Sequence, residues 1–511
     1  MKKTIYITLL IAFVAFTTGC KKDFLSELGT NPNQPSAVPV QLLLPPVLTG
    51  LANYEISQNT RVGVWMGYGS FSGGYSIDDN TLTYYVNQGA PSVWGLYDVL
   101  KNADYIEKQA AMQENLDYFV AAAKVLKAFG FQHLVDAYGK VPYSDAFKGV
   151  GNFFPKYDEG QSIYDASIIQ LDSAIAIIQN ADVATATTLG NNDIMFHGDM
   201  DKWLEFANTV KLKFLIRESA VIGAAGKAEL DKSAGVGFIT YDAGVNPGYL
   251  NTDGKQSPLW AAYGVSPGGS LYSDGYTFLR AGGAGVEFLK ENNDPRLSYI
   301  YAPKGADVAP NVAKYFQVDT DVKHFSGVFY GDRKTATDSG VSKISGIGHG
   351  VMSGYNQSVN LISASQSFFL QAEAALTGWI TGDPKELYQQ GITASFETLG
   401  VTNAATSAAN YYSQNKNLVS WEASTNKLEA IITQKWIANA YTHSLVSWAE
   451  YRRTGFPKVN VLPLTMFPGY DRHIPTIFWY PKSEADTNQD NYKAAGGPNT
   501  DPQNQKVFWD K

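Results

Sequence analysis

Two stretches of the chain combine aromatic side chains with small polar residues in a way that suits sugar binding. A sugar ring has an apolar C–H face and a belt of hydroxyl groups, so its binding site offers a flat ring to the face and polar groups to the belt. We expect ligand-binding residues in stretches 61–95 and 235–360, namely Trp65, Tyr68, Tyr75, Asp79, Trp260, Tyr263 and Tyr272. The competing interpretation is that many of these rings are packing residues.

No pattern in the sequence indicates a catalytic or metal site. The six histidines are scattered, and no two stand four residues apart, the spacing that places two metal ligands on one helix face. Residues 264–268 spell a nucleophile elbow, but Pro267 and Gly268 cannot start the helix which that motif requires. Residues 486–491 offer oxygen ligands without the glycine and glutamate of a calcium loop. We therefore expect no catalytic residue, no metal and no cofactor.

Two arginine-containing segments, residues 294–296 and 451–454, could hold an anionic ligand. Each lies next to a predicted helix end, where arginine more often pairs with a carboxylate or a carbonyl group. We interpret both segments as structural. A pair of converging carboxylates, as in a glycoside hydrolase, stays open, because any two of the 48 acidic residues could form it.

Charge and composition narrow the class of ligand. The 511-residue chain has 40 basic and 48 acidic residues and a net charge of −8; without a leader that contains Lys2 and Lys3 the charge is 38 minus 48, or −10. So acidic a chain is not expected to bind nucleic acid. Only 17% of the residues are charged, which leaves a surface of neutral polar side chains suited to neutral ligands.

The beginning of the chain predicts a lipoprotein signal. Residues 1–19 have a basic start, an apolar run from Ile5 to Phe16 and small residues before Cys20, the only cysteine. The run is shorter than the ~20 residues that cross a bilayer. We expect a signal peptide over 1–19, a lipid on Cys20 that anchors the chain to the membrane, and a proline-rich tether over 20–46. Ordinary secretion with a chance cysteine is the alternative.

Helical periodicity dominates residues 95–220 and 360–460. Apolar residues recur there at the 0, 3, 4, 7 spacing of one helix face, and this pattern predicts helices at about 161–180, 199–219, 365–379 and 384–399. The last two span roughly 34 residues with their turn, a tetratricopeptide-like period. We predict a mainly α-helical fold of tetratricopeptide-like helix-turn-helix pairs packed on a loop-rich, irregular ligand-binding half. Residues 47–511 would form this single composite domain. The alternative to tetratricopeptide-like pairs is a set of unrelated antiparallel helices.

Segments of recognisable sequence occur in order along the chain: residues 121–143, 155–178, 198–217, 294–297, 367–379, 433–436, 451–457, 480–481 and 507–510. Together they resemble the SusD/RagB family of nutrient-binding outer-membrane lipoproteins of the Bacteroidetes. The resemblance covers nearly the whole chain after Cys20. It departs from the family at residues 474–481, which lack the arginine usual before the Tyr-Pro pair.

The resemblance implies a role but no substrate. Members are binding proteins without enzymatic activity that cover a SusC-like TonB-dependent transporter and deliver an oligosaccharide or peptide to it. The implied location is the outer membrane, lipid-anchored and exposed at the cell surface. Two alternatives stay open: a lipoprotein glycoside hydrolase, and a structural transporter lid without a ligand site of its own.

Overall fold

The computed structural model describes residues 38–71, 93–272, 278–306, 315–332, 340, 342–458 and 473–510. Within these residues the chain is mainly α-helical, as predicted. None of the helices described is both long and apolar enough to cross a membrane. The expected signal peptide and most of the expected tether lie outside the described residues.

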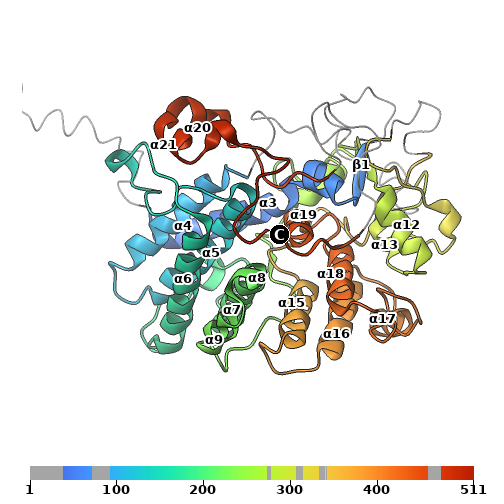
Figure 1. Ribbon diagram of the computed structural model, residues 1–511, viewed down its shortest axis with the longest axis horizontal. Helices are drawn as coiled ribbons and strands as arrows, with labels where there is room; N and C mark the ends of the chain where they lie inside the picture. Colours follow the sequence, from blue (N-terminus) through green and yellow to red (C-terminus); the bar gives the residue numbers. More distant parts are fainter. Residues whose placement is uncertain are drawn as a thin grey trace, which may run out of the picture.

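Eight helices form four successive pairs, and most of them lie side by side along the long axis of the molecule (Figure 1). In chain order they are α4 (Leu96–Ala110), α5 (Asp117–Tyr138), α6 (Gly160–Asn180), α7 (Met200–Arg217), α15 (Ala364–Leu376), α16 (Pro384–Thr398), α18 (Lys427–Ala438) and α19 (Ser444–Thr454). Helix α5 packs on α4 and α6, and α7 packs on α6 and α15. The helices predicted at about 161–180 and 384–399 are confirmed as α6 and α16.

Helix α7 shows how the sequence sets these elements. The Asp199 carboxylate accepts a hydrogen bond from the Lys202 backbone N–H at 3.2 Å and so caps the first turn. The apolar stripe that follows is fully buried, with Trp203, Phe206 and Phe214 at 0% exposure. Capping fixes where the helix begins, and the stripe fixes which face turns inward.

The first helix begins earlier than the expected boundary between tether and domain. A 3₁₀ turn, η1 (Val40–Leu43), leads into α3 (Leu44–Ser57), and a π-helical turn, η2 (Asn59–Gly63), follows it. Pro45 and Pro46 occupy the first turn of α3, where the missing N–H groups of proline cost nothing. Both prolines fall within the expected tether of residues 20–46, and in the structure they belong to the helix.

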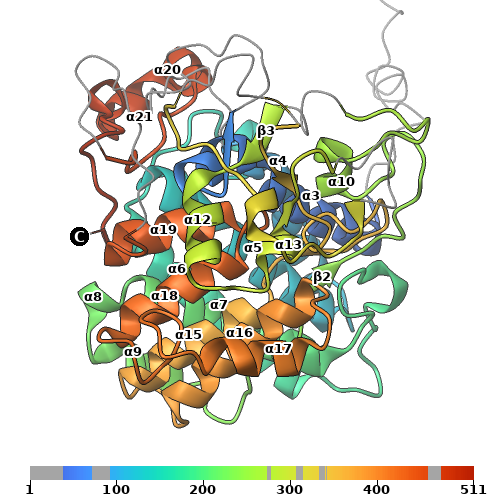
Figure 2. The ribbon, with the colours of Figure 1, turned by 90° about the vertical axis from the view of Figure 1, so that its right-hand side faces the viewer.

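The rest of the chain between the helix pairs is irregular, with three two-stranded antiparallel sheets. The sheets pair β1 (Gly69–Phe71) with β3 (Leu279–Ala281), β2 (Gly244–Val245) with β6 (Val359–Asn360), and β4 (Tyr301–Ala302) with β5 (Gly346–Ile347). Three helices that the sequence did not predict interrupt the loops: α10 (Pro258–Tyr263), α12 (Gly283–Glu291) and α13 (Leu297–Ile300). Figure 2 shows α10, α12 and α13 on one side of the molecule.

The remaining elements are short. They are α8 (Ser219–Ile222), α9 (Ala225–Asp231), α17 (Ala404–Tyr412), α20 (Lys482–Thr487), α21 (Gln489–Ala494) and the 3₁₀ turns η4 (Gly149–Gly151), η5 (Gly190–Asn192), η6 (Val322–His324) and η7 (Gly497–Asn499). Residues 486–491, the weak match to a calcium loop, lie in α20 and α21. The amides of Asn488 and Asn491 donate to the carbonyl oxygens of Pro155 and Phe154, so they serve packing.

A buried ionic network joins the two groups of helix pairs. Arg453 of α19 donates to both Glu373 oxygens of α15, at 2.7 and 2.8 Å, and to Glu450 at 2.6 and 2.9 Å. Lys435 of α18 reaches the other Glu450 oxygen at 2.9 Å, and Arg217 of α7 lies 3.5 Å from it. Burial opposes the charge of Glu450, but the three cations outweigh it and hold the pKa of Glu450 well below its ordinary value.

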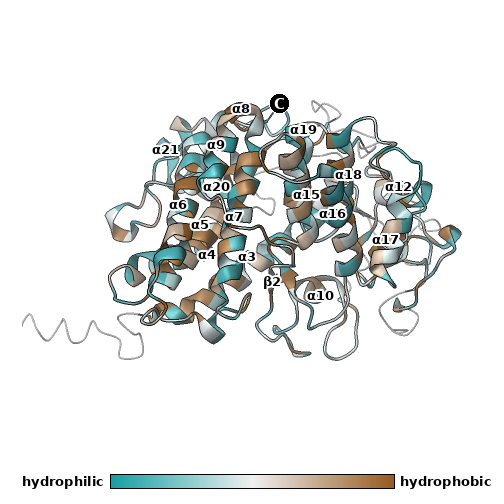
Figure 3. Ribbon diagram, turned by 90° about the horizontal axis from the view of Figure 1, so that it is seen from below, coloured by the Kyte–Doolittle hydropathy of each residue, from teal (hydrophilic) through white to brown (hydrophobic). Residues whose placement is uncertain are grey.

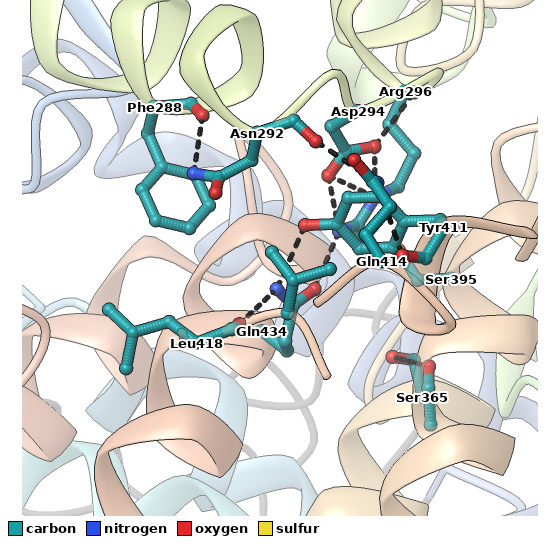
Figure 4. Close-up of polar contacts among 12 residues, drawn as sticks. Phe288, Asn292, Asp294, Arg296, Ser365, Ser395, Tyr411, Gln414, Leu418 and Gln434 are labelled. Atoms are coloured by element: carbon teal, nitrogen blue, oxygen red, sulfur yellow. Dashed lines mark hydrogen bonds and ion pairs between the residues drawn. The ribbon is translucent and has the colours of Figure 1, made fainter. Parts of the chain in front are cut away.

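Arg296 plays the same part in the loop-rich half. Figure 4 shows its guanidinium group between Asp294, at 2.6 Å, and the Gln434 side-chain oxygen of α18, also at 2.6 Å. The rings of Phe396 and Tyr411 lie 5.0 and 5.2 Å from it. Both arginine segments therefore use their charges inside the fold, which confirms the structural interpretation.

Replacing Arg453 with Leu is expected to lower the free energy of unfolding by about 3–5 kcal/mol, because Glu373 and Glu450 would stay buried without their main partner. Chemical denaturation measures the change. The matched control is Lys482→Ala, which removes a solvent-exposed pair with Asp486 and should cost under about 1 kcal/mol. Equal effects of the two substitutions would contradict the role given to the network.

Glu218, at the junction of α7 and α8, gives the stability a pH dependence. Burial, with Asp165 and Glu229 nearby, raises its pKa from 4.5 to about 7, against the hydrogen bond from Gln161. Between those two pH values the folded chain keeps a proton that the unfolded chain has lost, so stability falls as pH rises. The Glu218→Gln variant should melt at the same temperature as the wild type near pH 4. Near pH 8 its melting temperature should be higher than that of the wild type by about 5 °C. Identical melting curves at both pH values would contradict this.

Candidate functional site

A cavity of about 370 Å³ lies where the helix pairs meet the loop-rich half. Its helical side is formed by the start of α15, the end of α16 and the connection from α18 to α19. Its other side is formed by α10, β6 and the segment 350–358. Figure 3 shows β2 and α10 together, near α3 and below the C-terminal helices. The volume is within the range of small-molecule sites.

The loop side of the cavity is held by a short strand pair and its flanks. Val245 pairs with Val359, and the Asn246 amide donates to the Asn356 carbonyl at 3.0 Å and the Ser358 hydroxyl at 3.3 Å. The Gln357 side chain accepts from the backbone N–H of Ser353 at 2.8 Å. These bonds shape the segment 350–358, which we call the cavity loop.

Only two of the described cavity-lining residues are ionisable, Asp242 and His443, and each bonds to protein groups. The Asp242 carboxylate accepts from the Ala364 N–H at 2.8 Å and from the Thr398 hydroxyl at 3.0 Å. The His443 ring bonds to the Asn360 carbonyl at 2.9 Å, and its burial lowers its pKa. His443 is therefore neutral at neutral pH.

The rest of the lining combines neutral polar groups with apolar side chains. The polar groups belong to Ser353, Asn356, Ser358, Asn360, Thr398 and Thr442, and the apolar side chains are Ile56, Leu259, Ile300, Leu399 and Ile437. Amide and hydroxyl groups can both donate and accept hydrogen bonds. The cavity therefore matches a neutral ligand that carries hydroxyl or amide groups and an apolar face.

A second, open hollow adjoins the cavity through Ser358, which lines both. Its other walls include Asn191, His197 and Asn246. Its lining, in the described residues, contains the polar side chains of Asn191, His197, Asn246 and Ser358 and no carboxylate or amine. A ligand longer than the cavity has a polar surface next to it.

The structure brings three of the predicted ligand-binding residues close to this site. Trp260 and Tyr263 belong to α10, whose Leu259 lines the cavity, and they are 8% and 4% exposed. The Trp260 indole N–H donates to the Val265 carbonyl at 3.0 Å, and the Tyr272 hydroxyl donates to Gln256 at 2.7 Å. These aromatic residues support the cavity wall and its neighbouring loop.

Trp65 and Tyr68 lie elsewhere, in the core. Trp65 is 3% exposed and packs edge-on against Trp448, with ring centroids 5.8 Å apart. Tyr68 is fully buried, stacks on Trp436 at 5.4 Å and donates to its carbonyl oxygen at 2.6 Å. In this structure neither ring is available to a ligand, because both side chains are buried in the core.

The other predicted residues, Tyr75, Asp79 and the anchor Cys20, lie outside the described residues. Their roles stay predictions.

Sequence analysis missed the cavity loop and two tyrosines beside the site. Tyr355, between the lining residues Ser353 and Asn356, is 38% exposed. The Tyr249 hydroxyl is buried without a hydrogen-bond partner among the described residues, and burial raises the pKa of Tyr249 to about 12. Both tyrosines lie in the aromatic stretch 235–360 that the sequence indicates as ligand-binding, but the predicted residues in that stretch are Trp260, Tyr263 and Tyr272.

The described residues give no sign of a catalytic centre in this cavity. Asp242 is the one carboxylate that lines it, and both of its oxygens hold protein groups. No cluster of three or more potential metal ligands occurs in the parts of the chain that the structure describes.

Comparison with known proteins places the chain in a family. Residues 32–481 match the model of a SusD-like family described as starch-binding and associating with the outer membrane. Comparison with curated protein sequences gives no match.

Several solved structures share the fold. A chitin-binding SusD homologue from Flavobacterium johnsoniae is 23% identical, with a TM-score of 0.74 over 92% of this chain and 98% of that one. A SusD homologue from Bacteroides fragilis is 21% identical, with a TM-score of 0.72 over 93% and 99%. A protein described as chitin-binding is 26% identical, with a TM-score of 0.71 over 92% and 99%. The chain thus belongs to the SusD-like family of outer-membrane-associated binding proteins.

Proposed function

We propose that this protein captures a neutral oligosaccharide at the cell surface and delivers it to a TonB-dependent transporter of the outer membrane. The cavity between α10, the cavity loop and the helix ends would hold part of the sugar chain. The observation that carries the proposal is the composition of the lining, which combines neutral amide and hydroxyl groups with apolar side chains. A sugar ring offers the matching hydroxyl belt and C–H face.

The family supports the class of ligand. The family description names starch, and two structural neighbours are described as chitin-binding. Both polymers are neutral. An anionic ligand would find no cationic group among the described lining residues, because His443 is neutral. The oxygens of Asp242, the one carboxylate there, already accept hydrogen bonds from Ala364 and Thr398.

Capture and delivery also require a place at the membrane. The expected lipid on Cys20 would supply the anchor, and the SusC-like transporter would be the partner. Two other functions compete with this proposal. A glycoside hydrolase would need a second carboxylate about 5–10 Å from the first, and a structural lid would need no ligand.

Calorimetric titration of the chain from residue 21 onward tests the ligand. Of malto-oligosaccharides, chito-oligosaccharides and neutral peptides, we expect one oligosaccharide class to bind. Asn356→Ala should weaken binding by about tenfold, the effect of losing one or two hydrogen bonds. Asn180→Ala, an exposed asparagine at the end of α6, is the matched control and should leave the affinity unchanged.

The remaining outcomes separate the alternatives. Binding of peptides but of no oligosaccharide would show that the ligand is a peptide. Accumulation of shortened sugar chains on long incubation would favour the hydrolase. A folded chain that binds nothing, yet copurifies with a transporter, would favour the structural lid.

Cys20→Ser tests the anchor separately. Without the thiol no lipid can be attached, so we expect the variant to appear in the soluble fraction while the wild type stays with outer membranes. Metabolic labelling with a radioactive fatty acid gives an independent readout. A variant that stays in the membrane fraction and still incorporates label would refute the role of Cys20.

A further inference from the structure

An exposed apolar tip projects from the connection between α5 and α6. Three of its residues, Val150, Phe153 and Phe154, are 90%, 70% and 60% exposed. Exposed apolar side chains are unremarkable when scattered singly, but these three lie within five residues. We call residues 149–154 the apolar tip.

The fold holds the base of this tip firmly. The Phe147 ring packs 6.1 Å from Phe131 and 5.9 Å from Tyr97. On the other side, the Asn491 amide of α21 donates to the Phe154 carbonyl at 2.8 Å. The backbone is therefore fixed while the Phe153 and Phe154 rings point to solvent. Such an arrangement keeps apolar surface exposed in the free protein and ready for a partner.

The tip also lies near the place where the described chain begins. The Val38 N–H donates to the Tyr105 hydroxyl of α4 at 3.3 Å. One turn of α4 also carries Asp104 and Lys108, which line a hollow of about 220 Å³ together with Phe147 and Lys148. Figure 1 shows α4, α5 and α6 at the same end of the molecule.

This position near the start of the described chain favours a lipid membrane as the partner of the apolar tip. Seventeen residues, 21 to 37, lie between Cys20 and Val38, and this length of chain can span at most about 60 Å. The family associates with the outer membrane, so an anchor at Cys20 would hold this end of the molecule within that distance of lipid. Lys148 and Lys156 flank the tip, and long basic side chains beside an inserted apolar segment extend to polar headgroups.

We propose that the apolar tip inserts Val150, Phe153 and Phe154 into the lipid surface and so fixes the orientation of the anchored protein. The attraction is mainly apolar, because Lys148 is already paired with Asp145. Added salt should therefore weaken it little. This contact is independent of sugar capture, so either proposal can fail while the other stands.

Labelling at single cysteines tests the proposal. The chain from residue 21 onward contains no cysteine, so Phe154→Cys or Val183→Cys introduces the only thiol for a polarity-sensitive dye. A polyhistidine tag in place of residues 1–20 attaches each chain to vesicles of phosphatidylethanolamine and phosphatidylglycerol with a nickel-chelating lipid. We expect a blue shift of the dye emission at position 154 and none at position 183, which is 83% exposed in the unlabelled protein.

A second measurement uses sedimentation of untagged chains with the same vesicles without the nickel lipid. The combined Val150→Ser, Phe153→Ser and Phe154→Ser variant should bind about tenfold more weakly than the wild type. The matched control replaces the exposed Ile169, Val183 and Val221 with Ser and should bind like the wild type.

The opposite results would overturn the proposal. These are an unshifted dye at position 154 on tethered vesicles, or equal vesicle binding by the tip variant and the control variant. If the dye stays unshifted but the tip variant no longer copurifies with a transporter, the partner of the tip is a protein and not the membrane. Oligosaccharide titration of the tip variant should match the wild type in every case.

Discussion

Two buried carboxylates, Glu373 and Glu450, are the constraint on which the arrangement of the helix pairs depends. Each is 5% exposed or less as a side chain, and both bind Arg453. A buried charge without a partner costs several kcal/mol (about 3–5), so α15, α18 and α19 must keep the positions that complete the set. Arg217 of α7 contributes to the same cluster, and the N-terminal helices are thereby fixed to the C-terminal ones.

The proposed binding cavity depends on that arrangement. Its helical wall is made of helix ends, including Ser363 before α15 and His443 before α19. Asp242 ties the loop-rich half to the same ends by accepting from the Ala364 N–H and the Thr398 hydroxyl. A shift of α15 against α16 would separate those two donors. The ionic core therefore holds the helix ends that shape the cavity, although its own charged residues do not line the cavity.

The sequence predicts the helices far better than the site. Period and caps are local signals, so α6 and α16 begin and end within a residue or two of their predicted bounds. Burial of Trp65 depends on Trp448 and Phe478, which lie roughly 400 residues further along the chain. Composition alone cannot show which rings such distant partners cover. The cavity loop has no aromatic or charged motif beyond Tyr355, and it becomes a wall only because Asn246 bonds to Asn356, 110 residues further on.

The small number of charged groups in the cavity limits how tightly each part of a ligand can bind. Few residues are charged in this chain, 17%, and many of those form the core network or surface pairs. The cavity is left with amides and hydroxyls, each of which contributes only about 0.5–1.5 kcal/mol on binding. Affinity would then grow by small steps with the number of sugar units in contact. Under the proposed function such binding retains a long chain yet releases it readily, which is what a protein that passes its ligand to a transporter requires.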